Sequence, residues 1–450
     1  TKQMTNIRNF HLIISFFLFF IGLTTSCYAN LIRDAEIETK LEAFLEPLLK
    51  KANISSQIKV RVILNSSYNA FVTSDNVIYL HSGLLLKAES LEEVIGVMAH
   101  ELGHIVSGHV ARKNESLEVA RNASSLSTAL AAAAAIGGSE ELAASLLIGG
   151  NDRVARHYYY GSRINEAIAD EWALKMLDEL QISAAGMARM MKRLSNENAL
   201  PESYQSEYYR THPEAKKRLA VYKDHLTKSN FTNNRMNIGD YASFKRIVGK
   251  ISSYEKRPEE IIQNLKNDTL SIDEMYQRAI AYLRYGSLEK ASKDVSSLLI
   301  AEPNNPYFYE LAGEIAFADR LLPSAIKYFE EAFNKSGGAP LIALRLGRVF
   351  LSADSSEYYF NAREILKIAV AGEPKLPFAR REYATALGKT GDLAGANLQL
   401  AEAAYLSNDL RQATNHLERA LKIPNLNPEL EKSLKDLKFL IQDSQTLKTK

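Results

Sequence analysis

The stretch His100-Glu101-Leu102-Gly103-His104 decides how this chain folds around its chemistry. Two histidines four positions apart on a helix lie on one face, one turn apart, so both imidazoles can reach a single metal ion. The glutamate between them then lies beside the metal, where its carboxylate can take a proton from water. The stretch therefore predicts a catalytic zinc site carried by a helix.

The surrounding sequence predicts this helix independently of the motif. Ser90 is a good N-cap, Glu93 three residues later completes a capping box, and the apolar run continues to Val110 without a proline. The residues next to the motif carry no charge, which suits a buried helix. The alternative is an ordinary helix with two unrelated histidines. It is disfavoured because burying these polar groups is costly unless they have partners.

A catalytic zinc site needs a third protein ligand, with one position left open. In the metzincin pattern this ligand is a third histidine, but Ser107 and Val110 occupy the glycine and histidine positions that the pattern requires. His109 is out of register and points about 140° around the helix from His104. We interpret His109 as a residue of the helix surface or one that supports a ligand.

A carboxylate from a later helix is the other source of the third ligand. Glu166 is the best candidate, and Asp170 lies one turn further on the same helix face. Glu166 could bind the metal while Asp170 accepts the second N–H of a ligand histidine and so fixes its tautomer. The alternative is a solvated acidic face, which the neighbouring Ile164, Ile168 and Trp172 disfavour.

Several further motifs accompany the motif helix. They are Asn69-Ala70-Phe71, Ser82-Gly83-Leu84-Leu85, the run from Gly96 to His104, Glu166-x-x-x-Asp170 and Thr211-His212-Pro213. Together these motifs resemble the HtpX and CAAX-prenyl-protease superfamily of zinc metallopeptidases. Within it, the chain looks like the BepA-like proteins, which join such a domain to tetratricopeptide repeats.

The resemblance implies a role for each matching residue. It makes His100, His104 and Glu166 the ligands of one zinc ion per chain, and Glu101 the general base. It makes Asp170 a partner of a ligand. His212 matches a loop histidine that can approach the metal, either to occupy the open position at rest or to donate to the transition-state oxyanion. The polar stretch before it, with Tyr204, Tyr208 and Tyr209, also looks like a loop. The family often has an acidic residue where this chain has Ile168, which leaves the ligands intact.

Composition excludes other classes. The chain has 450 residues, enough for two or three domains, and its 24% charged and 46% hydrophobic residues are ordinary for a globular protein. A formal charge of +2 is too small for a nucleic-acid footprint. Neither a P-loop nor a G-x-G-x-x-G motif is present. We therefore expect no nucleic acid and no nucleotide cofactor.

The N-terminal residues read as a secretory signal peptide. Lys2 and Arg8 precede an apolar run at 12–23 that is short for a bilayer span, and small residues lead to a cleavage site after Ala29. The alternative is lipoprotein processing at Cys27. Since Cys27 is the only cysteine, cleavage after Ala29 leaves zinc with nitrogen and oxygen ligands alone.

The next segments surround the motif helix. Residues 31–50 predict an amphipathic helix, and residues 58–64 and 69–81 predict short strands whose edge could pair with an extended peptide substrate. Residues 123–150 contain two apolar stretches of small residues with glycine pairs. We interpret them as a lid between the two metal-binding helices. A peripheral membrane contact is the alternative.

The C-terminal half contains repeats. Small residues recur with spacings of 34, 37 and 34 positions at Ala291, Ala325, Ala362 and Ala396. A period of about 34 residues is typical of tetratricopeptide repeats. Helix 393–406 is expected to close one pair and open the next, and helix 430–442 to cap the array. Such solenoids offer a concave groove to peptides or partner proteins.

We therefore expect an α+β protein in four parts. These are a signal peptide (1–29), a mainly helical gluzincin-type metalloprotease domain with a small sheet (30–225), a helical linker (226–270) and an all-α tetratricopeptide solenoid (271–450).

Two functions remain open. The first is a periplasmic zinc endopeptidase whose repeats recruit substrates or a partner. The resemblance implies that it acts on misfolded or unassembled outer-membrane proteins or with their assembly machinery. The second is a chaperone or assembly scaffold with a silent or repressed protease site. The intact Glu101 favours the first function, because a scaffold does not need a general base.

Overall fold

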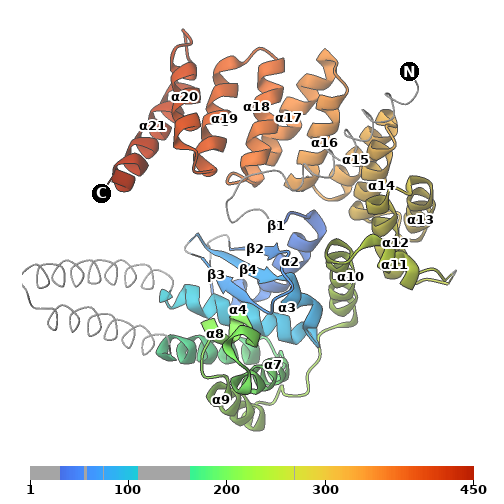
Figure 1. The fold of residues 1–450 in the computed structure, drawn as a ribbon, viewed down its shortest axis with the longest axis vertical. Helices are drawn as coiled ribbons and strands as arrows, with labels where there is room; N and C mark the ends of the chain where they lie inside the picture. The colour runs from blue at the N-terminus through green and yellow to red at the C-terminus, as the bar shows by residue number, and fades with distance from the viewer. Residues whose placement is uncertain (1–30, 55–57, 74, 110–162, 268, 450) are drawn as a thin grey trace, which may run out of the picture. The chain divides into compact units, whose positions relative to one another are not determined.

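The structure, a computed structural model, describes residues 31–54, 58–73, 75–109, 163–267 and 269–449 (Figure 1). These residues form two compact units. The sheet unit comprises 31–32 and 37–255, and the repeat unit comprises 33–36 and 256–449. The expected signal peptide and the expected lid lie outside the described residues. Within the described part of the chain, no helix combines the length and the apolar character that a bilayer crossing requires.

A small mixed sheet lies at the centre of the sheet unit. Its strand order is β1 (Leu31–Ile32), β2 (Lys59–Ile63), β4 (Val77–His81) and β3 (Ala70–Val72). β2 and β4 run parallel, whereas β1 and β3 are antiparallel to their neighbours. The strands expected within 58–64 and 69–81 are confirmed. β3 lies at an edge of the sheet, with one side of its backbone not paired to another described strand.

The first helix among the described residues begins later than the sequence pattern indicates. Helix α2 covers Ala35–Lys51 and not 31–50, because Leu31 and Ile32 form β1 and pair with β2. The apolar face expected for this helix is confirmed, since its leucines at 41, 45 and 48 are fully buried.

Helix α4 (Leu91–Val106) carries the motif and packs against β3, β4 and α7. It ends four residues before the expected Val110, because Gly108 adopts a left-handed conformation with φ of 65°. The Ser90 side chain caps the helix by accepting a hydrogen bond from the backbone N–H of Glu93. The expected bond back to the N–H of Ser90 is replaced, because Glu93 Oε2 accepts from the backbone N–H of Glu89 (3.4 Å). The other oxygen, Oε1, accepts from the Tyr68 hydroxyl (2.8 Å) and pairs with Arg193.

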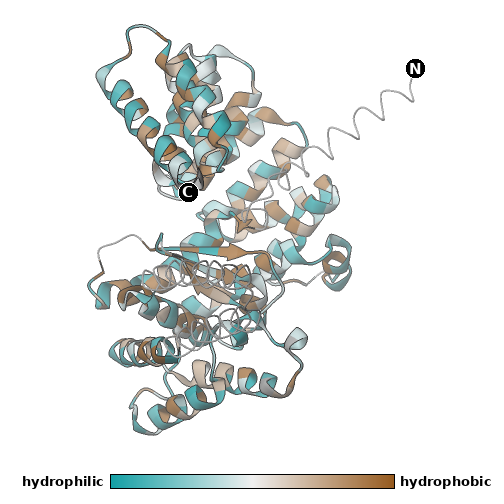
Figure 2. Cartoon of the chain, turned by 60° about the vertical axis from the view of Figure 1, so that its left-hand side comes forward, coloured by the Kyte–Doolittle hydropathy of each residue, from teal (hydrophilic) through white to brown (hydrophobic). Residues whose placement is uncertain are grey.

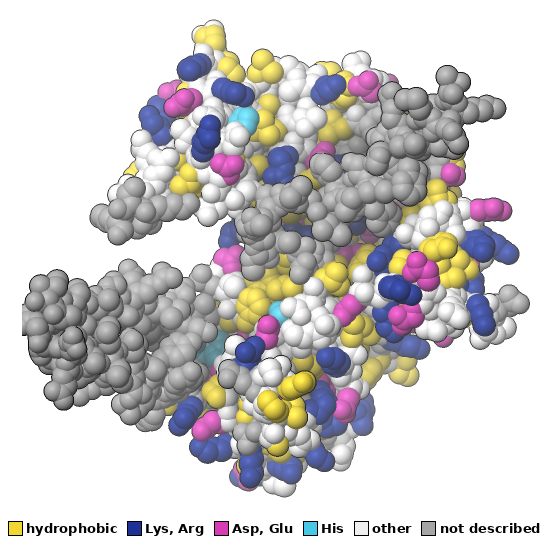
Figure 3. Space-filling view, in the orientation of Figure 1, with side chains coloured by type: hydrophobic (Ala, Val, Ile, Leu, Met, Phe, Trp, Pro, Cys, Tyr) yellow, Lys and Arg dark blue, Asp and Glu magenta, His cyan; other side chains and the backbone are white. Residues whose placement is uncertain are grey.

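The remaining helices of the sheet unit share one hydrophobic core with the sheet and α4. They are α3 (Ser82–Lys87), a helix at 163–179, α7 (Ala185–Asn196), α8 (Glu207–Thr211), α9 (Ala215–Lys228) and α10 (Ile238–Glu255). Two short 3₁₀ segments, Glu197–Ala199 and Glu202–Tyr204, precede α8. On the face shown in Figure 3, basic and acidic side chains are intermixed over the described surface.

The repeat unit is a series of helices that pack as neighbouring pairs. In chain order they are α11 (Pro258–Asn264), α12 (Ile272–Tyr285), α13 (Leu288–Ala301), α14 (Pro306–Ala318), α15 (Leu322–Lys335), α16 (Pro340–Ser352), α17 (Ser356–Gly372), α18 (Pro377–Lys389), α19 (Leu393–Leu406), α20 (Leu410–Leu421) and α21 (Pro428–Thr449). Helix α19 packs against both α18 and α20, as expected for helix 393–406. The final helix is longer than the expected 430–442.

Small residues allow the paired helices to cross closely. The four recurring alanines are buried, and a Cβ added at Gly347 would lie 2.4 Å from the Leu366 side chain. Figure 2 shows hydrophilic and hydrophobic residues alternating along the repeat helices, the two-faced pattern of helices that pack in pairs. Residues 33–36 also belong to this unit, since Arg33 pairs with Glu373 (2.7 Å) and Glu36 accepts from the Tyr276 hydroxyl (2.9 Å).

Candidate metal centre

Helix α4 brings the two motif histidines together at one point. His100 is fully buried and His104 nearly so, and their Nε2 atoms lie 3.2 Å apart. Glu101 is buried on the same helix. The sequence spacing explains why these nitrogens face each other, because residues four positions apart lie one turn apart on the same face of a helix.

Glu166 completes a donor set with these histidines. Its two carboxylate oxygens lie 3.3 Å from His100 Nε2 and 3.3 Å from His104 Nε2. Donor atoms at about 2.0–2.2 Å from a tetrahedral zinc are about 3.3–3.6 Å from one another. The two imidazole nitrogens and the Glu166 oxygens that face them are therefore close enough to bind one metal ion together. Helix 163–179 reaches this position because Gly103 allows a close approach, since a Cβ there would lie 3.0 Å from the Ala169 backbone.

Further side chains contact the Nδ1 atoms of the two histidines, on the side of each imidazole away from Glu166. Asp170 accepts a hydrogen bond from His100 Nδ1 (2.9 Å), which leaves the lone pair of His100 Nε2 for a metal. His109 is buried, and its Nδ1 lies 2.9 Å from His104 Nδ1. This contact with a candidate ligand agrees with the second interpretation of His109 and not with a place on the helix surface. His109 reaches this position because α4 ends before it.

Arg218 is the principal site residue that the sequence does not single out. This buried side chain of α9 contacts Glu166 (2.8 Å) and makes two bonds of 2.7 Å to Asp170, which also accepts from the Tyr222 hydroxyl (2.8 Å). In the sequence, Arg218 ends a basic run typical of a solvated helix face. The available signal is its position between Ala215 and Tyr222, three and four residues away on one buried face.

The charges of the centre favour a divalent cation. Among the described residues it contains three buried carboxylates, of Glu101, Glu166 and Asp170, against one guanidinium, of Arg218. With neutral imidazoles the formal charge is −2, which is costly to bury without a counter-charge. Burial and Arg218 lower the pKa of His100, but Asp170 and Glu166 outweigh them and raise it to about 9. The pocket thus stabilises positive charge where a metal would lie.

Glu101 is poised as a base at neutral pH. Burial raises the pKa of Glu101, but the imidazoles of His212, His104 and His100 outweigh burial, so the net shift is downward. An ionised carboxylate beside the donor set can accept a proton from water.

His212 faces the centre from the end of α8. Its Nε2 lies 3.3 Å from Glu101 Oε1, and one donor atom each of His100, His104, Glu166 and His212 lie within 4.8 Å of one another. The sequence indicated a polar loop before His212, and this was wrong. Residues Glu207–Thr211 form α8, because Ser206 caps it and Tyr208 is fully buried in the core.

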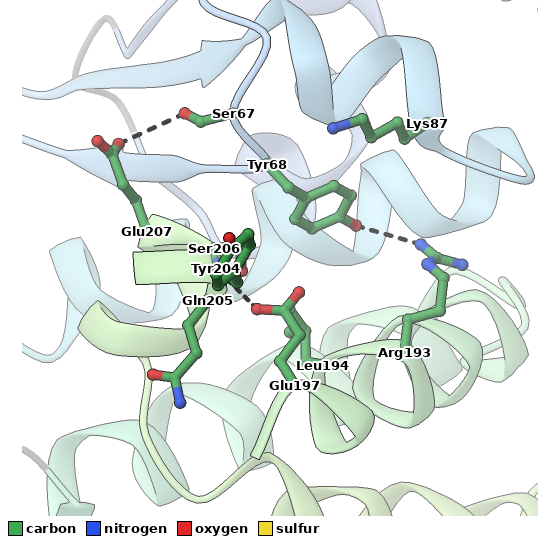
Figure 4. Close-up of a pocket in the computed structure, with 10 residues that line it drawn as sticks. All are labelled: Ser67, Tyr68, Lys87, Arg193, Leu194, Glu197, Tyr204, Gln205, Ser206 and Glu207. Carbon is green, nitrogen blue, oxygen red and sulfur yellow. Dashed lines mark hydrogen bonds between the residues drawn. The ribbon is translucent and has the colours of Figure 1, made fainter. Parts of the chain in front are cut away.

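A cavity of about 540 Å³ adjoins α8 (Figure 4). It is lined by Ser67, Tyr68, Lys87, Arg193, Leu194, Glu197, Tyr204, Gln205, Ser206 and Glu207. At its wall Glu207, the first residue of α8, accepts hydrogen bonds from Asn69 Nδ2 (3.0 Å) and Ser67 Oγ (3.5 Å). At its first residue, Glu207, helix α8 therefore contacts Asn69, which directly precedes edge strand β3. At its other end, His212 contacts Glu101 of the candidate metal centre.

A helix bearing His-Glu-x-x-His packed against a sheet edge, with a carboxylate from a later helix beside both histidines, defines an HExxH metallopeptidase. Comparison with known families gives the same class. Residues 33–225, which contain the candidate metal centre, match the family described as Peptidase family M48.

The matches to curated relatives extend beyond residues 33–225. Beta-barrel assembly-enhancing proteases of Vibrio cholerae serotype O1 and Escherichia coli O157:H7 are each 24% identical, over 63% and 74% of this chain. The matches span 59% and 69% of those proteins. Metalloprotease LoiP of Escherichia coli (strain K12) is 30% identical over 39% of this chain and 66% of its own length.

Solved structures match parts of the chain only distantly. MamA aligns with 37% of this chain and 95% of its own at 16% identity and a TM-score of 0.32. A thermophilic TPR protein of Thermus thermophilus aligns with 41% of this chain and 93% of its own at 20% identity and a TM-score of 0.29. The packing of neighbouring helices in the repeat unit itself defines its fold.

Proposed function

We propose that the chain is a zinc-dependent endopeptidase with one zinc ion, held by His100, His104 and Glu166. Glu101 is the general base, Asp170 orients His100, and His212 occupies the fourth position at rest. The observation that carries the proposal is the three donor separations of 3.2–3.3 Å at a buried site of formal charge −2.

The residues of the chain divide the reaction between them. A bound zinc ion supplies a Lewis acid that polarises a carbonyl and makes water easier to deprotonate. Glu101 takes a proton from the attacking water while the water oxygen bonds to the carbonyl carbon and the π electron pair moves to the carbonyl oxygen. When the oxygen returns this pair, the C–N bond breaks and the amine nitrogen takes the proton from Glu101. Arg218 keeps the Glu166 and Asp170 carboxylates ionised and in place.

The test of this proposal combines metal content with hydrolysis. Purified protein is expected to carry one zinc per chain and to cleave casein or an unfolded porin, and a chelator should stop cleavage until zinc is restored. Stoichiometric zinc without cleavage would favour the alternative, a scaffold with a silent protease site. Absence of tightly bound metal would reject the proposal.

We infer that the substrates are extended segments of misfolded or unassembled outer-membrane proteins. Two features support this. The edge strand β3 packs on α4 and offers its open side to an added strand. The relatives that match most of this chain are named beta-barrel assembly-enhancing proteases. The repeats would recruit the substrate or an assembly partner through their groove.

The rest position of His212 gives a prediction of definite sign. His212→Ala should raise basal proteolysis, because it removes the fourth donor; a rise of about tenfold would correspond to nine in ten molecules capped at rest. Cleavage of casein without a partner measures the effect, with zinc content as a second readout. His225→Ala is a matched control, since His225 bonds to Asp178 on another part of the sheet unit.

The outcome distinguishes the two roles of His212. A lower kcat with zinc retained would contradict the cap and support a role in transition-state stabilisation. Unchanged turnover and unchanged metal affinity would reject both roles.

Periplasmic location gives a second prediction. The basic residues, short apolar run and small residues before Asn30 support export and cleavage after Ala29. N-terminal sequencing of the protein from the periplasmic fraction is expected to begin at Asn30. A lipidated Cys27 at the N-terminus would instead place the protein on a membrane surface, and an uncleaved N-terminus would contradict the signal peptide.

A further inference from the structure

The metal centre contains a buried hydroxyl that the roles assigned above do not use, that of Tyr208. The side chain is fully buried in α8, and its hydroxyl makes no hydrogen bond to any of the described residues. Burying a hydroxyl without a partner costs folding free energy, so such groups are rare in native proteins. The hydroxyl therefore calls for a partner that arrives during the reaction.

Tyr208 is held rigidly beside the catalytic groups. Its ring stacks on the His212 imidazole, with centroids 4.0 Å apart and planes at 13°, and meets the Tyr68 ring edge-on at 6.3 Å. Its backbone N–H donates to the carbonyl oxygen of Tyr68 (3.3 Å). Burial, and then the nearby charges of Glu101 and Glu166, raise the pKa of Tyr208 well above its ordinary value. The hydroxyl thus remains a donor.

We propose that Tyr208 is a further catalytic residue, whose hydroxyl donates a hydrogen bond to the carbonyl oxygen of the scissile peptide bond. The proposal rests on the endopeptidase function proposed above. As water attacks, the π electron pair moves onto this oxygen, and the hydrogen bond strengthens without transfer of the tyrosine proton. A fixed, desolvated donor stabilises such developing charge effectively because it need not reorganise.

The position of Tyr208 is compatible with movement of the His212 imidazole away from the metal position. His212 lies just past the last residue of α8, with φ of −122° and ψ of 79°, so its imidazole can rotate without unwinding the helix. Tyr208 lies inside α8 and is fixed by Tyr68. Departure of the imidazole would uncover the Tyr208 ring and present its hydroxyl to a bound peptide.

The test is Tyr208→Phe in the full-length protein, which removes the hydroxyl and keeps the stacked ring. The kcat for an unfolded substrate is expected to fall about 10²-fold, with KM and zinc content unchanged. The affinity for a phosphinic peptide, whose tetrahedral phosphinate oxygens stand for the oxyanion, should fall by a similar factor. The thermal midpoint should stay equal or rise, because no described hydrogen bond is lost. Tyr209→Phe, one position along α8, is the matched control.

Each outcome bears on a different statement. Unchanged kcat and phosphinate affinity in Tyr208→Phe would overturn the role of Tyr208 and leave the endopeptidase function standing. A lower thermal midpoint with unchanged phosphinate affinity would assign the hydroxyl a structural role and overturn the proposal. If the unsubstituted protein neither cleaves in a chelator-sensitive way nor binds the phosphinic peptide, the endopeptidase function fails, and the role of Tyr208 falls with it.

Discussion

Glu101→Gln is expected to abolish most hydrolysis while the protein keeps its zinc. The glutamine preserves the shape of the side chain but cannot accept a proton from water, and loss of a general base costs roughly 10²–10⁴-fold in kcat. Zinc binding should survive, because the donor set of His100, His104 and Glu166 is untouched. Metal analysis, KM and kcat on an unfolded porin measure the three quantities separately.

His104→Ala is the informative comparison for Glu101→Gln. This change removes one corner of the donor set, so metal and activity should be lost together. His225→Ala serves as a control for loss of a histidine elsewhere in the sheet unit. Stoichiometric zinc in His104→Ala would show that the ligand assignment is wrong. Full activity in Glu101→Gln would show that another group deprotonates the water.

The second large effect is expected for Gly103→Val. A Cβ at this position would lie 3.0 Å from both Cα and the carbonyl oxygen of Ala169, and backbone atoms cannot turn aside as a side chain can. Helix 163–179 must then move away from α4 and carry Glu166 with it. Overpacking of this kind costs about 1–3 kcal/mol, so we expect the zinc affinity to fall about 5–150-fold.

Helix propensity alone would predict the opposite result, a more stable α4, because valine is a better helix former than glycine. Gly388→Ala in α18 is the control for relief of a helical glycine, since its Cβ would meet Ala396 only at 4.0 Å. That variant should be neutral or stabilised in thermal unfolding. Unchanged zinc affinity in a folded Gly103→Val protein would refute the account of how the two helices position the site.

Local patterns made much of the protein predictable from its sequence. The spacing of His100 and His104 fixes their geometry within one helix, and the apolar residues in 58–64 and 69–81 mark strands with buried positions. The recurring alanines likewise mark crossings between neighbouring helices. In each case the physical cause lies within a few residues or one repeat.

The features that sequence did not predict depend on distant partners. Arg218 looks solvated until Glu166 and Asp170 are placed beside it. The two-residue strand β1 exists because β2 is there to pair with it. Tyr208 lies in a stretch whose composition suggests an exposed loop, and only the tertiary fold buries it. Long-range contacts of this kind leave no periodic signal along the chain.

The unpaired side of edge strand β3 has a consequence for which proteins the enzyme would leave uncleaved. A strand in a finished barrel is hydrogen-bonded on both sides, because closure of a barrel removes every sheet edge. Such a strand has no backbone groups left to offer to β3. Under the proposed function, an outer-membrane protein would therefore stop being a substrate when its first and last strands pair and close the barrel. Its amino-acid sequence and its cleavage sites would remain the same.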